Sequence, residues 1–136
     1  MKIAIDFDGT IVEHRYPDIG REIPFATATI RMLIEQGHQV FLWSVREGEY
    51  LDAAVQWCAK RGIEFYAVNA NYPGETTDDP HYSRKLKADL FIDDRNMGGL
   101  IDWGVIAEMI QTRKSYIEIL TMRTQAIKPK KKWWQW

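Results

Sequence analysis

Apolar residues recur in two different patterns along the chain. Four short runs are almost continuously apolar, which is typical of strands that are buried on both faces of a parallel sheet. Between the early runs lie longer segments whose apolar residues have helical spacing. The four runs occupy residues 2–7, 38–44, 63–69 and 88–93. This alternation predicts an α/β fold, a three-layer Rossmann-like sandwich whose parallel sheet has four or five strands in the order 4-1-2-3.

Two helices are predicted between the first three strands. The first begins at Pro24, since proline suits the first helical position, and Gly37 ends it. Its apolar face follows from the spacing and comprises Phe25, Ala28, Met32 and Leu33. The second helix spans residues 48–61 and is capped by Gly62. Its shared face comprises Leu51, Ala54, Val55 and Cys58.

The C-terminal part is predicted to be helical in two pieces. Apolar spacing indicates a helix around residues 105–110, and the periodicity lapses over residues 112–114. Ser115 and Glu118 have the spacing of a capping box, which restarts a helix to about Ala126. Residues 1–127 are therefore interpreted as a single domain, followed by a basic and aromatic tail at residues 128–136.

Composition excludes several classes of protein. The chain has 136 residues, of which 46% are hydrophobic and 27% charged, as in a globular domain. A net charge of -1 gives no general attraction to nucleic acid or membrane. Cys58 alone cannot form an internal disulfide, which fits a cytoplasmic setting. Asp6 and Asp8 interrupt any signal-peptide pattern, and no apolar run approaches the ~18 residues of a membrane span.

Acidic residues directly follow two of the predicted strands. Asp6 and Asp8 follow the first strand, and Asp93 and Asp94 follow the fourth. Ligands of open parallel sheets bind beyond the carboxyl ends of the strands, so four carboxylates would meet at one edge. Two like charges ~4 Å apart repel by ~4 kcal/mol at an effective dielectric of 20, so a cation should neutralise them. The simpler alternative is that these acids only cap turns.

Four motifs in this order resemble those of haloacid-dehalogenase-like (HAD) phosphohydrolases. They are "DFDGT" at residues 6–10, Ser44 after an apolar strand, a lysine before the last strand, and "FIDD" at residues 91–94. The resemblance spans roughly residues 1–96 and is greatest for short bacterial members without an inserted domain. The segment "ADLFIDDR" also looks like the same segment of 5'(3')-deoxyribonucleotidases.

The resemblance implies a role for each motif. Asp6 would be the nucleophile that forms an aspartyl-phosphate, and Asp8 would be the general acid and base. Mg²⁺ would be held by the carboxylates of Asp6 and Asp94 and the backbone carbonyl of Asp8, with Asp93 acting through water or orienting the shell. Ser44 would donate a hydrogen bond to a phosphoryl oxygen.

Other residues are candidates for binding the phosphate and the leaving group. Lys85 aligns best with the family lysine, but Arg84 and Lys87 stay open, and all three could form a solvated basic patch. Substrate contacts are expected from Gly9, Thr10, Val45, Arg46 and Arg95. The alternative for the charged members is ion pairing among Arg46, Glu47 and Arg95.

The segments between the motifs are too short for a cap domain, which needs at least ~50 residues. Residues 10–24 are interpreted as a flap in which His14, Arg15 and Tyr16 could contact a phosphate ester. The tail mixes lysines with tryptophans, as single-strand nucleic-acid binders do, but packing on the body or on a second subunit is favoured. A homo-oligomer stays open.

The sequence predicts a Mg²⁺-dependent phosphatase that acts on a small phosphate ester, such as a nucleotide. One alternative is a phosphate- or nucleotide-binding protein of the same fold without turnover, whose tail contacts nucleic acid or a partner. A phosphotransfer receiver module is disfavoured, because no Asp ends the third strand at Asn69.

Overall fold

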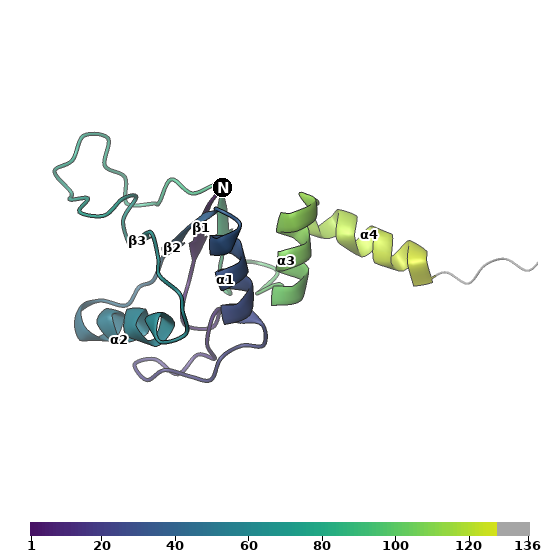
Figure 1. The fold of residues 1–136 in the computed structure, drawn as a ribbon, viewed down its shortest axis with the longest axis horizontal. Helices are drawn as coiled ribbons and strands as arrows, with labels where there is room; N and C mark the ends of the chain where they lie inside the picture. Colours follow the sequence, from purple (N-terminus) through teal and green to yellow (C-terminus); the bar gives the residue numbers. More distant parts are fainter. Residues whose placement is uncertain (128–136) are drawn as a thin grey trace, which may run out of the picture. The chain divides into compact units, whose positions relative to one another are not determined.

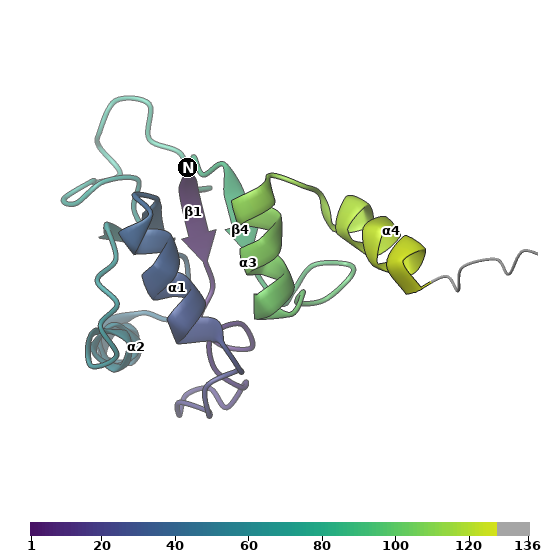
Figure 2. The same ribbon diagram turned by 45° about the vertical axis from the view of Figure 1, so that its right-hand side comes forward.

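Four short parallel strands form one sheet. Their spatial order is β3-β2-β1-β4, which is the predicted order counted from the opposite edge. Figure 1 shows β3, β2 and β1 in this order, and Figure 2 shows β4 next to β1. Ile5 lies beside both Leu42 and Ile92, so the carboxyl ends of three strands meet along one edge. The strands are β1 (Lys2–Ile5), β2 (Gln39–Leu42), β3 (Ala67–Val68) and β4 (Leu90–Ile92).

The computed structural model describes residues 1–127, so the predicted tail at residues 128–136 lies outside the described residues. The chain divides into two compact units, Met1–Ile101 and Asp102–Trp136. The first unit holds the whole sheet together with the two helices that connect β1 to β3. The α/β class and the parallel sheet are therefore as predicted.

A hydrogen bond connects helix α1 (Ala26–Glu35) to the residues just after helix α2 (Gly48–Ala59). The guanidinium of Arg31, in the middle of α1, donates a hydrogen bond of 2.7 Å to the Arg61 carbonyl beyond α2. Helix α1 also packs next to β2, and Figure 2 shows it in front of β1. Two consecutive right-handed crossovers in one direction place both helices on the same face of the sheet.

Helix α1 begins two residues later than predicted, and it buries the predicted apolar face only in part. Phe25 has a left-handed backbone (φ 68°), so the regular helix cannot extend back to Pro24. The Glu22 carboxylate accepts a hydrogen bond from the Thr27 amide and satisfies one free donor of the first turn. Phe25 and Ala28 are exposed, and the buried apolar positions are Ala26, Ile30 and Leu33.

Glycine ends α1 as predicted. Gly37 has a φ of +89°, its amide donates to Ile34, and the next amide, of His38, donates to Leu33. These two bonds form a Schellman motif, which needs a left-handed residue at this position. Gly62 closes α2 in the same way, and Ala54 and Cys58 of the predicted face are buried there.

The third strand is much shorter than predicted. The apolar run covers residues 63–69, but only Ala67–Val68 pair as a strand. Residue 66 contributes one further backbone bond, from the Tyr66 amide to the Val40 carbonyl. The apolar character of the run comes partly from Ile63, which is buried outside the sheet.

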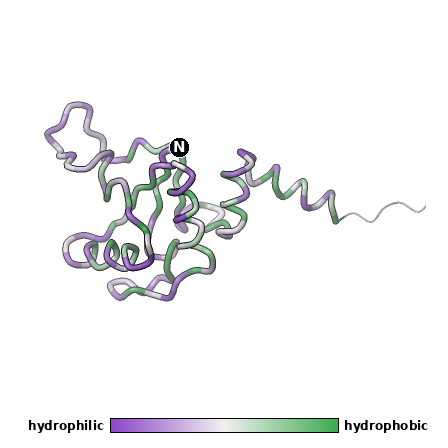
Figure 3. Tube along the Cα trace, in the orientation of Figure 1, coloured by the Kyte–Doolittle hydropathy of each residue, from purple (hydrophilic) through white to green (hydrophobic). Residues whose placement is uncertain are grey.

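The two faces of the sheet bury alternate residues. Ile3, Ile5, Val40 and Leu42 point to the face that α1 and α2 cover. The other face packs a cluster of Ala4, Phe41, Ala67 and Leu86, with Trp43 and Phe91 at its margin. Leu86 comes from the long loop between β3 and β4, which is otherwise mostly hydrophilic (Figure 3).

The second unit contains helices α3 (Trp103–Thr112) and α4 (Tyr116–Ile127), which contact each other. Asp102 caps α3 by accepting from the Gly104 amide at 2.8 Å. Arg113 adopts a left-handed backbone and ends α3 where the periodicity lapses. The capping box is confirmed: the amides of Ser115 and Glu118 each donate to the other's side chain. Within residues 1–127, no helix has the length and apolar character to cross a membrane.

Candidate functional site

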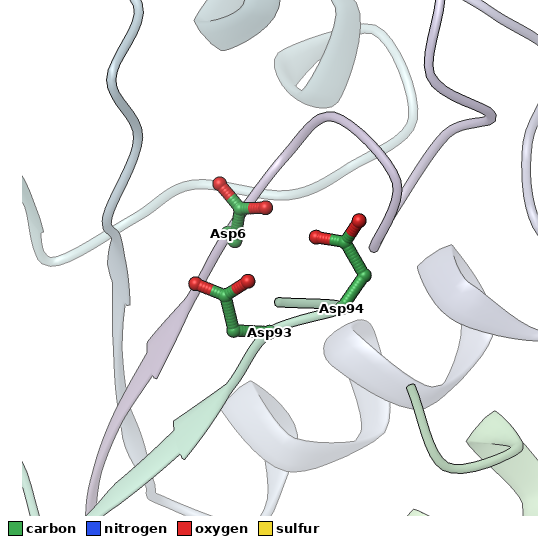
Figure 4. Close-up of side chains that lie close together, drawn as sticks. All are labelled: Asp6, Asp93 and Asp94. Atoms are coloured by element: carbon green, nitrogen blue, oxygen red, sulfur yellow. The ribbon is translucent and has the colours of Figure 1, made fainter. Parts of the chain in front are cut away.

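Three carboxylates converge at the carboxyl edge of the sheet. Asp6 follows β1 directly, and Asp93 and Asp94 follow β4. One oxygen from each lies within 4.8 Å of the others. Figure 4 shows the three carboxylates grouped together, one from the end of β1 and two from the end of β4. The convergence predicted from the strand ends is therefore present for these three acids.

Among the described residues, the acid cluster (Asp6, Asp93 and Asp94) has no ion pair that would balance its negative charge. Within residues 1–127, no lysine or arginine forms an ion pair with any of the three. Burial raises the pKa of Asp6 from 3.8 to about 7, with further contributions from the charge of Asp93 and a hydrogen bond with Asp94. Half-buried, oxygen-only donors with excess negative charge are what a hard metal ion requires. The cluster could therefore hold a metal ion.

Thr10 ties the two sides of the cluster together. Its fully buried hydroxyl lies 3.2 Å from Asp6 Oδ2 and 3.3 Å from Asp94 Oδ1, and it accepts a 3.0 Å bond from the Asp94 amide. The sequence indicated that Thr10 contacts a substrate, whereas its side chain lies within the protein and positions the acids. Gly9 beside it has a φ of +80° and lies directly against the Asp94 carboxylate.

Asp8 is not part of the acid cluster, and its carboxylate binds Arg46 while also lining the same cavity. Arg46 Nε donates to Asp8 Oδ2 and Nη2 donates to Asp8 Oδ1, each at 2.7 Å. The sequence predicts a substrate contact for Arg46. Its side chain is fully buried, however, so the guanidinium cannot contact a substrate directly. The hydrogen bonds to Asp8 raise the pKa of Arg46, which stays charged. Arg46 pairs with Asp8 rather than with Glu47 or Arg95.

Ser44 is held by an asparagine that the sequence analysis missed. The Ser44 amide donates to Asn69 Oδ1 at 2.8 Å, and Asn69 Nδ2 donates back to the Ser44 carbonyl at 2.9 Å. The Ser44 hydroxyl accepts from the Arg46 amide at 3.0 Å. Asn69 follows β3, so the signal for its role is a polar residue at the carboxyl end of a third strand.

A cavity of about 460 Å³ lies over the candidate site. The acidic part of its wall comprises Asp6, Asp8 and Asp93. The rest of the wall combines aromatic, polar and basic residues with one aliphatic side chain and comprises His14, Tyr16, Trp43, Ser44, Val45 and Arg95. Trp43 was not predicted as a site residue, although it precedes Ser44 directly. Val45 and Arg95 thus lie where the sequence placed them, together with the flap residues His14 and Tyr16.

The three candidate basic residues before β4 have different surroundings. Lys85 Nζ lies 5.1 Å from the centre of the Phe91 ring. Phe91 and Asp93 are two positions apart, so their side chains point to the same face of the sheet. Lys87 Nζ instead donates to the His81 carbonyl at 3.0 Å. Arg84 is exposed. None of the three lines the cavity.

The raised pKa of Asp6 predicts how stability depends on pH in the metal-free protein. Between the unfolded value of 3.8 and the folded value of about 7, the folded state binds the proton more tightly than the unfolded chain. The contribution of Asp6 to the free energy of unfolding is therefore full below pH 3.8, falls as pH rises, and is lost above about pH 7. Urea unfolding in EDTA should show that the free energy of unfolding of the wild type declines across this pH range, and the decline should be smaller in Asp6→Asn. Equal declines in the two proteins would contradict the raised pKa of Asp6.

The fold and site together define an α/β protein with an acidic, oxygen-lined centre at the carboxyl edge of a parallel sheet. A solved structure of a conserved protein from Bacteroides thetaiotaomicron is 61% identical, with a TM-score of 0.83, and the match covers 88% of this chain and 96% of that one. The chain therefore belongs to the same family as that Bacteroides protein. No protein-family model matches the chain.

A second similarity is more distant. A Bacillus cereus protein described as a "Putative nucleotidase" is 24% identical over 72 residues. The match covers 53% of this chain and 38% of that protein, so the chain spans well under half of its length.

Proposed function

We propose that the chain is a Mg²⁺-dependent phosphohydrolase of the HAD-like superfamily that cleaves phosphate monoesters. The observation that carries the proposal is the acid cluster, which forms no ion pair within residues 1–127 and lies beside a cavity that Ser44 also lines. The likeness to the Bacillus cereus protein supports hydrolysis of a nucleotide. Residues 1–127 would act as one catalytic domain without a cap.

Asp6, Asp93 and Asp94 are the residues that would hold the metal ion. Their donors are all carboxylate oxygens, and Mg²⁺ is the hard cation that usually accompanies phosphate chemistry. The chemistry that a bound Mg²⁺ supplies is neutralisation of negative charge on the phosphoryl oxygens. The backbone carbonyl of Asp8 would complete the donor set.

Asp6 and Asp8 divide the covalent chemistry between them. A carboxylate oxygen of Asp6 attacks phosphorus while the bond from phosphorus to the leaving oxygen breaks, and Asp8 gives that oxygen a proton. Asp8 then accepts a proton from water, which attacks phosphorus and breaks its bond to Asp6. Arg46 takes one lone pair of each Asp8 oxygen, so each oxygen keeps another with which to exchange a proton.

Ser44 and Lys85 would bind the phosphoryl group. Asn69 fixes the backbone of Ser44 from both sides, which leaves the hydroxyl hydrogen free to donate while its oxygen accepts from the Arg46 amide. Lys85 shares a face of the sheet with Asp93, whereas the Lys87 ammonium is engaged by His81. These surroundings favour Lys85 as the lysine that offsets charge between nucleophile and phosphate.

The leaving group would occupy the part of the cavity lined by Tyr16, Trp43 and Arg95. Aromatic faces and a guanidinium suit a planar base, because both can stack on it. The volume of about 460 Å³ lies within the ~300–1,000 Å³ typical of small-molecule sites. A nucleoside monophosphate is the substrate class that these features favour.

The test of the function is hydrolysis of p-nitrophenyl phosphate and a panel of nucleotides and sugar phosphates. We expect turnover with Mg²⁺, loss of at least about 100-fold in EDTA, and recovery when Mg²⁺ is added back. Phosphate release measures all substrates on one scale. Tight nucleotide binding without phosphate release would instead favour a binding protein of the same fold. Full activity in EDTA would contradict the metal assignment.

A further inference from the structure

The Arg46 guanidinium uses all five of its N–H donors inside the protein. Nε and one N–H of Nη2 donate to the Asp8 carboxylate. The second N–H of Nη2 donates to the Asp18 carbonyl at 2.8 Å. Nη1 donates to the carbonyls of Pro17 at 3.1 Å and Tyr50 at 3.2 Å. An arginine has five donors in a fixed fork, so none is left for a ligand.

These bonds join three segments that are far apart in the sequence. Asp8 follows β1, Pro17 and Asp18 belong to the tip of the flap (residues 10–24), and Tyr50 lies in the first turn of α2. The guanidinium carbon also lies 5.2 Å from the centre of each of two rings, Phe7 and the flap residue Tyr16. Arg46 is therefore the central contact between the flap tip and the rest of the site.

The two ends of the flap are held in different ways. Its stem is held by the backbone, since the Glu13 amide donates to Arg21 at 2.7 Å and the Ile23 amide donates to Ile11 at 2.9 Å. Its tip is held by Arg46 through two carbonyls and the Tyr16 ring, and the Tyr16 ring also packs edge-on against Tyr50 with ring centres 5.8 Å apart. Loss of the guanidinium would release the tip while the stem stays formed.

We propose that Arg46 is a positioning residue that locks the flap tip and the Asp8 carboxylate into one rigid unit beside the cavity. The flap residues His14 and Tyr16 then form a fixed wall of the cavity instead of a lid that opens with each turnover. Asp8 is held in one orientation toward the reacting group. The catalytic consequence rests on the proposed function, but the locking of the flap does not.

Hydrogen exchange measured by mass spectrometry tests the locking without any assay of activity. In Arg46→Lys, we expect peptides that cover residues 14–20 to exchange at least about tenfold faster, because lysine cannot reach two carbonyls and a carboxylate in fork geometry. Peptides that cover β1 and β2 should keep their protection. Arg21→Lys is the matched control, since Arg21 is an exposed flap residue whose ion pair with Glu13 lies at the stem. Unchanged exchange at residues 14–20 in Arg46→Lys would overturn the proposal.

A second variant covers the case in which Arg46→Lys does not fold. The double variant Asp8→Asn/Arg46→Gln removes both buried charges together, so neither is left unpaired. Its flap peptides should also exchange faster than those of the wild type. Wild-type protection of the flap in this folded double variant would equally overturn the proposal.

Kinetics separate positioning from a general loss of structure. In Arg46→Lys, we expect kcat to fall by about 100-fold, as a small displacement of a catalytic group can cause, with KM changed by less than about threefold. A higher KM with unchanged kcat would show that Arg46 serves binding, contrary to the proposal. A wild type without phosphatase activity but with Arg46-dependent flap protection would refute the proposed function and leave the locking role intact.

Discussion

Asp6→Asn is expected to abolish phosphate hydrolysis and at the same time to stabilise the metal-free fold. Asparagine has nearly the same shape but cannot attack phosphorus, so kcat should fall by about 10⁴-fold or more. The same change removes a carboxylate whose pKa is raised to about 7 by burial and by the charge of Asp93. The thermal midpoint in EDTA at pH 8 should therefore rise, because the unfavourable charge is gone.

The two readouts together distinguish a nucleophile from a structural acid. Substitution of a structural residue would lower the thermal midpoint and kcat together. Asp6→Asn should instead lower kcat and raise the thermal midpoint. Asp52→Asn is the matched control, since Asp52 is exposed on α2 and should change neither quantity. Asp6→Asn with near wild-type turnover would contradict the nucleophile assignment. A lowered midpoint in EDTA would contradict the electrostatic account of the cluster.

The sheet and its acidic edge could be predicted because the signals are local. Each acid of the cluster directly follows an apolar run, and parallel strands bring their carboxyl ends to one edge whatever the details of the loops. Register then places Asp6 beside Asp93, one position beyond Ile5 and Ile92. The meeting of Asp6 and Asp93 therefore follows from the strand ends alone and does not depend on how any loop folds.

The partner of Asp8 could not be predicted, because the contact depends on the path of the flap. Arg46 is surrounded in the sequence by residues that are mostly exposed, and a charged residue after a strand usually faces solvent. It is buried only because the carbonyls of Pro17 and Asp18 turn back onto it. The predicted buried face of α1 was right only in part, since Leu33 is buried but Phe25 and Ala28 are exposed. The left-handed backbone of Phe25 places it outside the helix, and the spacing of apolar residues carries no signal for that conformation.

Gly9→Ala is expected to disable the site through geometry alone, without changing any charge. Gly9 has a φ of +80°, a conformation that costs other residues about 1–2 kcal/mol. In addition, a Cβ at this position would clash with the Asp94 carboxylate. Either the turn or Asp94 must move, and each movement separates Asp94 from Asp6 and Thr10. We expect metal affinity to fall by about 10–100-fold, as when a group that positions metal ligands is lost, and activity to fall with it.

Gly37→Ala provides a control that separates backbone strain from the clash. Gly37 also has a left-handed backbone, with a φ of +89°, but nothing lies within 4 Å of a Cβ built there. Both variants should therefore lose stability in urea unfolding, while only Gly9→Ala should lose Mg²⁺ binding in calorimetry. Equal metal affinity in the two variants would mean that Asp94 tolerates displacement and is not a required ligand. Loss in Gly9→Ala alone would show that the left-handed turn after Asp8 sets the distance between the two halves of the acid cluster, since this glycine alone of the two lies against a carboxylate.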